Sequence, residues 1–173
     1  MRLLLACAAI IAAGLIAGTA FATQAGYQWS SAKNLTIYDT TTHQQWTDAL
    51  AKAATDWSVS PYVNITVERV DICPQKAKIC VRDFNNENGP FYAYALIWVR
   101  NSDHIYKAWI MLNSYNIDWT SPQYVFDRTL CHEVGHVLGL GYNPNDTVSC
   151  MGNGIPGVPS ALDFADLEAM YGH

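Results

Sequence analysis

Apolar and polar residues follow regular spacings along most of this chain. Residues 35–38, Leu-Thr-Ile-Tyr, alternate as a short strand does. From Trp46 to Trp57 the apolar residues recur every three or four positions, which places them on one helical face, and Pro61 marks the end of that helix. Residues 39–42 stand where they would cap it. We therefore expect a strand followed by a helix whose apolar face belongs to the core.

Several further strands are predicted after this helix. Val63, Ile65 and Val67 alternate with polar residues, which is typical of a strand with one solvated face. Residues 79–84 form the next strand, and the turn-forming run 85–90 separates it from a β-rich segment at 91–99. That segment and residues 106–113 flank a short connection, 101–104, so we expect an antiparallel pair with a solvated His104 between its strands.

Two more helices complete the pattern. Pro122 opens one of them, and Gly139 and Gly141 mark its end. Residues 161–171 form the last helix, with its apolar side chains turned largely inward. No internal repeat, low-complexity tract or interdomain linker interrupts this order.

Length and charge limit the classes of protein. A chain of 173 residues, half of them apolar, suits one well-buried domain. Fifteen acidic residues exceed ten basic ones and no basic run is present, so nucleic acid is not an expected partner. We expect a monomer.

The N-terminus has the pattern of a signal peptide. Arg2 precedes an apolar stretch, residues 3–17, and Ala20-Phe21-Ala22 is a small-x-small cleavage site. Residues 1–22 are therefore predicted to be removed, which leaves 23–173 as a single secreted domain without stable membrane association. An uncleaved anchor is the alternative, because roughly 20 apolar residues can span a bilayer.

Four cysteines remain after such cleavage, an even number that suits an oxidising compartment. We expect the pairs Cys73–Cys80 and Cys131–Cys150, because each closes a short loop. Free thiols or thiolate metal ligands are the alternative.

The stretch LCHEVGHVLGLGYNPND, residues 130–146, carries the candidate chemistry. On a helix, His132 and His136 lie one turn apart, so both imidazoles can hold one zinc ion. Glu133 lies between them, where its carboxylate could reach a metal-bound water and act as general base. The pattern predicts peptide hydrolysis by an activated water, without a covalent intermediate.

Gly139 extends the match toward the longer pattern His-Glu-x-x-His-x-x-Gly-x-x-His, and here the chain resembles the metzincin zinc proteases of matrixin-like or snapalysin-like type. The resemblance implies an α+β, zincin-like fold: a twisted, mixed five-stranded sheet with an N-terminal helix, an active-site helix and a C-terminal helix. It also implies a zinc metalloendopeptidase that acts on peptides or proteins. Gly139 would end the helix in a left-handed conformation so that the chain turns back under the metal.

The family places its third zinc ligand at position 142, and this chain has Tyr142 there. A phenol is a poor ligand unless the metal draws off its proton. Asp146, Asn143, a water molecule and a thiolate from Cys150 are the alternatives. A metzincin-like protein that binds peptides or a partner without turnover is therefore the rival function.

Other segments take roles by the same resemblance. Met151 would be the methionine of the Met-turn, an apolar floor beneath the histidines, and a Cys131–Cys150 bridge would tie this turn to the active-site helix. Residues 91–99 would be the edge strand along which a peptide lies antiparallel. The loop 152–159, rich in Gly and Pro, would wall the leaving-group pocket, and its small residues favour an apolar one. Apart from the resemblance, the oxygen ligands of Asp83 and Glu87 and the turn 85–90 are candidates for a structural Ca²⁺.

Overall fold

The structure is a computed structural model that describes residues 24–89, 91–154 and 157–173. The predicted signal peptide, residues 1–22, lies outside the described residues. The elements follow in the order β1 (Ala32–Asp39), α1 (Gln44–Trp57), β2 (Val63–Arg69), β3 (Ile79–Phe84), β4 (Ala93–Arg100), β5 (His104–Asn113), α2 (Gln123–Val137) and α3 (Ala161–Tyr171). Within the described ranges, no helix has the length and apolar character needed to cross a bilayer.

The strands form one mixed sheet with the order β2-β1-β3-β5-β4. The β1–β2, β1–β3 and β3–β5 pairs are parallel, and only β4 and β5 run antiparallel. The predicted five-stranded mixed sheet and its antiparallel pair are therefore confirmed, with β4 at an edge. His104, expected in the connection, instead begins β5 and pairs with Arg100, because the turn is completed by Asn101 and Ser102 at positive φ.

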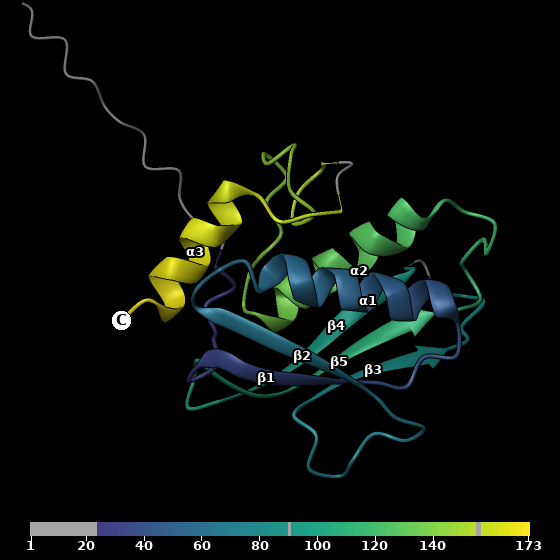
Figure 1. Cartoon of the computed structure of the whole chain (residues 1–173), viewed down its shortest axis with the longest axis horizontal. Coiled ribbons are helices and arrows are strands. Elements are labelled where there is room, and N and C mark those ends of the chain that lie inside the picture. Colours follow the sequence, from purple (N-terminus) through teal and green to yellow (C-terminus); the bar gives the residue numbers. More distant parts are fainter. Residues whose placement is uncertain (1–23, 90, 155–156) are drawn as a thin grey trace, which may run out of the picture.

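Helices α1 and α2 lie side by side over one face of the sheet, and α3 lies at one end of this layer (Figure 1). Alternate strand residues such as Ile37 and Ile110 are fully buried beneath the helices. Trp57 of α1 is also fully buried, and its indole Nε1 donates to the Cys131 carbonyl of α2 over 3.0 Å. Each large apolar side chain buried in this way stabilises the fold by about 1.5–3 kcal/mol.

The predicted cap of α1 is wrong. The N-cap residue is His43, which makes no side-chain capping bond. Asp39, at the end of β1, is instead fully buried and accepts hydrogen bonds from the Thr41 backbone (2.8 Å), Thr47 Oγ1 (3.1 Å) and Arg69 Nη1 (2.9 Å). A buried carboxylate needs such partners, so Asp39 joins β1 and β2 to α1 from the side.

The ends of α2 and α3 agree with the sequence. Pro122 precedes α2, and Gly139 follows it with a φ of 95°. A side chain at Gly139 would also collide with the Tyr27 carbonyl, so glycine is required there for two reasons. Ser160 caps α3 in a capping box with Asp163, in which each side chain bonds the other residue's backbone.

Both expected disulfides are present. Cys73 and Cys80 have Cα atoms 6.3 Å apart, and Cys131 and Cys150 have theirs 5.9 Å apart. The second bridge joins α2 directly to the loop that carries Met151. Because Cys150 is bonded to Cys131, it does not supply the thiolate ligand that the sequence left open.

Candidate active site

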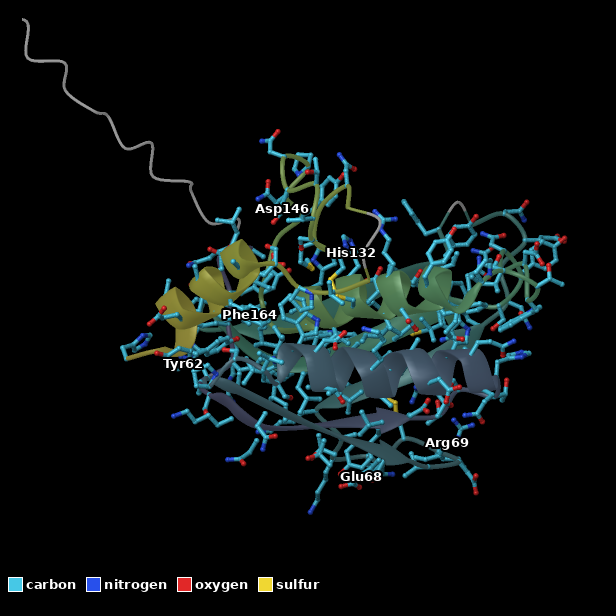
Figure 2. The ribbon with its side chains drawn as sticks, turned by 45° about the horizontal axis from the view of Figure 1, so that its top comes forward. Tyr62, Glu68, Arg69, His132, Asp146 and Phe164 are labelled. Atoms are coloured by element: carbon cyan, nitrogen blue, oxygen red, sulfur yellow. A yellow bond between two sulfur atoms is a disulfide. The ribbon has the colours of Figure 1, made fainter. Side chains whose placement is uncertain are left out.

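His132 and His136 converge on one point above α2. Their Nε2 atoms lie 3.0 Å apart, as expected for side chains one helical turn apart on the same face. Figure 2 shows His132 directed toward the loop that carries Asp146, on the opposite side of the molecule from Glu68 and Arg69. The helix thus presents both imidazoles to a single location at the surface of the domain.

Backbone carbonyls determine which nitrogen of each ring is available. His132 Nδ1 lies 2.8 Å from the Cys150 carbonyl, and His136 Nδ1 lies 2.9 Å from the Leu140 carbonyl. A carbonyl only accepts, so each Nδ1 is the protonated donor and each Nε2 carries a lone pair. This is the tautomer in which an imidazole coordinates a metal through Nε2.

The local electrostatics also keep the rings neutral. Burial, together with His136, lowers the pKa of His132 to about 4, and burial also lowers the pKa of His136. Two lone pairs that face each other at 3.0 Å repel unless a cation lies between them. Tetrahedral zinc with Zn–N bonds of about 2.1 Å separates its nitrogens by about 3.4 Å, so the pair is within a few tenths of an ångström of that spacing.

Glu133 directly follows His132 on α2, and its side chain projects into the cleft between this helix and β4. Burial raises the pKa of its carboxyl to about 7, and a hydrogen bond from the Ala95 backbone of β4 opposes this shift. Its Oε2 atom is buried without a hydrogen-bond partner among the described residues. A buried carboxylate oxygen without a partner is costly, which indicates a ligand or water at this position.

Met151 lies beneath the turn of α2 that separates the two histidines. It is fully buried, and a Cβ added at Gly135, between His132 and His136, would collide with the Met151 Sδ. The same Cβ would lie 2.9 Å from Cζ2 of Trp57. Glycine at this position therefore lets the thioether approach the helix backbone directly below the imidazoles.

The loop around Met151 is held in place by the start of α3. Ser149 Oγ donates to Asp163 Oδ2 over 2.5 Å and accepts from the Met151 backbone over 2.8 Å. Asp146 accepts from Ser160 Oγ through Oδ2 (2.6 Å) and from the Val148 backbone through Oδ1 (3.0 Å). These bonds hold the loop that carries Met151 against the start of α3.

The candidates for a third ligand are placed very differently. Tyr142 is about half exposed, its ring lies edge-on to His132 with centroids 6.0 Å apart, and its hydroxyl donates to Asn153 Oδ1 over 2.6 Å. Asp146 is buried with both carboxylate oxygens engaged, and Asn143 Oδ1 accepts from the Asn145 backbone. Among the described residues, no group of three or more His, Cys, Asp and Glu is arranged to hold a metal.

A cleft of about 330 Å³ opens beside these residues. Its lining comes from the residues before and at the start of β4, from α2 and from the loop after it: Phe91, Tyr92, Ala93, Arg128, Thr129, His132, Glu133, Tyr142 and Gly152. Arg128 is a member that sequence reasoning missed. It precedes His132 by four residues on the same helix, and that spacing is the signal that could have identified it.

The candidate calcium residues lie near the end of β3 and in the turn that follows it. Asp83 Oδ2 accepts from both the backbone and the hydroxyl of Thr42, at 2.7 and 2.9 Å. Glu87 is exposed in the turn. Asp83 thus ties the end of β3 to the segment before α1 through Oδ2, and the calcium site stays a prediction.

Comparisons with known proteins concern the fold alone. No protein-family model matches the sequence, and no curated protein matches it significantly. The solved structure of myroilysin is similar, with a TM-score of 0.59 at 14% sequence identity, over 88% of this chain and 98% of that chain. The chain therefore shares the α+β fold of myroilysin over nearly its whole length.

Proposed function

We propose that the protein is a zinc-dependent metalloendopeptidase of metzincin-like type, with His132 and His136 as zinc ligands and Glu133 as general base. The observation that carries this proposal is the pair of neutral imidazoles with Nε2 atoms 3.0 Å apart, next to Glu133, whose buried Oε2 has no hydrogen-bond partner in the described part of the chain. The fold shared with myroilysin supports it.

Zinc held there would supply a Lewis acid that polarises the scissile carbonyl and makes a water molecule more acidic. The protein's own contribution is to orient the rings through the carbonyls of Cys150 and Leu140. Glu133 takes a proton from the attacking water and passes it to the leaving amine. The low-dielectric cleft that raises the Glu133 pKa makes this carboxylate an effective base near neutral pH.

The edge strand β4 provides the surface for a peptide. Its outer edge has no strand partner in the sheet, so an extended substrate can pair with its backbone antiparallel to it. The Ala95 backbone contact with Glu133 holds the first part of this edge beside the base. Backbone pairing suits peptides of varied sequence, and side-chain selectivity then comes from the cleft.

Tyr142 is our candidate for the third zinc ligand, with a water molecule as the alternative. Its ring already lies beside His132, and the other protein candidates are engaged in the fold. Coordination would require the hydroxyl to give up its bond to Asn153. A protein that binds peptides without turnover would share the cleft, and the experiments below separate the two functions.

We also propose that the domain, residues 23–173, is secreted after removal of residues 1–22 and acts as a monomer. The two disulfides support an oxidising compartment. Peptide or protein substrates are the expected partners, and one catalytic zinc is the expected cofactor.

The first test measures zinc content after dialysis together with casein hydrolysis. Glu133→Gln should retain zinc and lose about 10²–10⁴-fold in kcat, because it removes the base and keeps the shape of the side chain. Glu68→Gln removes the same charge from the opposite side of the molecule and should behave as the native protein. If native protein and Glu133→Gln are folded, zinc-loaded and equally inert, the enzyme hypothesis fails.

The second test concerns Tyr142. Tyr142→His should keep or raise zinc affinity, and Tyr142→Phe should lower it, as measured by competition with a chromogenic chelator. Asn153→Ala removes the hydrogen bond of the phenol and keeps the phenol itself, so it serves as the control. Unchanged zinc affinity in Tyr142→Phe would assign the third position to water.

A further inference from the structure

Arg128 supplies a fixed positive charge in the wall of the cleft. Its Nε donates to the Gly154 carbonyl over 2.7 Å, and its Nη2 donates to the Gly152 carbonyl over 3.2 Å. These two bonds fasten the guanidinium to the loop after Met151. The side chain is partly buried, so its position is set by the fold and does not depend on a ligand.

The charge of Arg128 has no carboxylate partner among the described residues. The ion pairs recorded there involve Lys52, Arg69 and His104. Carbonyl groups satisfy two N–H donors of the guanidinium, but they carry no net charge. A guanidinium has five N–H donors, so three of them, including both on Nη1, have no hydrogen-bond acceptor among the described residues.

The direction of β4 determines which part of a bound peptide lies near Arg128. This strand runs from Ala93 to Arg100, and Phe91 and Tyr92 precede it at the end of the cleft that Arg128 also lines. A peptide that lies antiparallel to β4 has its C-terminal half at this end. The residues that follow the scissile bond are therefore the ones that come near the guanidinium.

We propose that Arg128 makes the cleft selective for a carboxylate on the leaving-group side of the scissile bond. The inference rests on the proposed peptidase function and names its substrate class. An Asp or Glu side chain, or the chain end of a short peptide, supplies the same group, which a planar guanidinium binds well. The small residues of the loop 152–159 predicted an apolar pocket. The cleft has a cation in its wall because Arg128 comes from α2, which the sequence of that loop does not reveal.

The test uses fluorogenic peptides that are identical except for Glu, Gln or Lys after the scissile bond. The zinc-loaded native protein should cleave the Glu peptide with a kcat/KM about tenfold above that of the Gln peptide. In Arg128→Gln this ratio should fall to about one. Arg128→Lys keeps the charge and should retain part of the preference, and Arg82→Gln, on β3, should leave the ratio at its native value.

A second arm distinguishes the source of the carboxylate. Peptides that end one residue after the scissile bond are compared with a free and with an amidated C-terminus. A preference for the free end alone would assign the site to chain ends, and a preference for Glu in longer peptides would assign it to side chains. Either result supports the inference.

Binding separates failure of this inference from failure of the proposed function. Anisotropy of labelled Glu and Gln peptides with the Glu133→Gln protein requires no turnover. If the zinc-loaded native protein hydrolyses none of these peptides while the Glu133→Gln protein still binds the carboxylate peptides more tightly, the peptidase is rejected and the carboxylate site is kept. The inference would be overturned if the native protein handled Glu and Gln peptides equally and also handled free and amidated C-termini equally. It would also be overturned if Arg128→Gln lost the same factor for peptides with and without the carboxylate.

Discussion

Replacing Gly135 by alanine tests how the helix beneath the two imidazoles is packed. The added Cβ would collide with the Met151 Sδ and lie 2.9 Å from Cζ2 of Trp57, and both side chains are fully buried. In an open helix the same change would stabilise the protein by about 1 kcal/mol, because alanine loses less backbone entropy than glycine. Here the methyl group has no space.

The magnitude follows from these two opposing effects. Overpacking of a dense core costs about 1–3 kcal/mol, so the net loss in the free energy of unfolding for Gly135→Ala should be about 1 kcal/mol. With a urea m-value of about 2 kcal/mol/M, the midpoint should fall by about 0.5 M. The assay is urea unfolding followed by tryptophan fluorescence, with zinc chelated and both disulfides intact.

A double-mutant cycle shows whether Met151 is the cause. Met151→Ala alone should cost about 2–5 kcal/mol through the cavity that it leaves. Adding Gly135→Ala to that variant no longer meets the thioether and keeps only the contact with Trp57, so this second step should cost less than it does in the native background. An equal destabilisation by Gly135→Ala in both backgrounds would refute the packing argument, and so would a gain of about 1 kcal/mol in the native background.

Two further predictions concern the supports around the site. Tyr171 donates to the Leu138 carbonyl, and burial raises the pKa of its hydroxyl from 10.0 to about 12. The folded state therefore favours the neutral phenol, and this contribution to the free energy of unfolding is lost as the pH rises from 10 toward 12. Urea unfolding should therefore show Tyr171→Phe about 1 kcal/mol less stable at pH 8 and less sensitive to pH between 10 and 12; an unchanged pH profile would contradict this. Asp146→Ala should lose about 1–3 kcal/mol of stability while the zinc content per folded molecule stays native, and zinc loss from the folded variant would make Asp146 a ligand after all.

Much of the fold could be predicted from the sequence because its local patterns agree with the tertiary structure. The boundaries of α3 agree with the prediction, and α2 begins directly after Pro122 as expected. Both disulfides followed from short loop lengths. The cap of α1 could not be predicted. Asp39 accepts a hydrogen bond from Arg69, which lies 30 residues further along the chain, and local sequence does not show this contact.

By itself the sequence determined the spacing of His132 and His136 and the end of their helix before Gly139, since helical periodicity and backbone sterics are local properties. Only the tertiary structure decided which ring nitrogens face each other, because the carbonyl partners come from Leu140 and from Cys150, eighteen residues beyond His132. It also engaged Asp146 with Ser160 and set Arg128 in the cleft wall. Those roles depend on which distant segments meet in space, and the periodicity of the sequence does not predict such contacts.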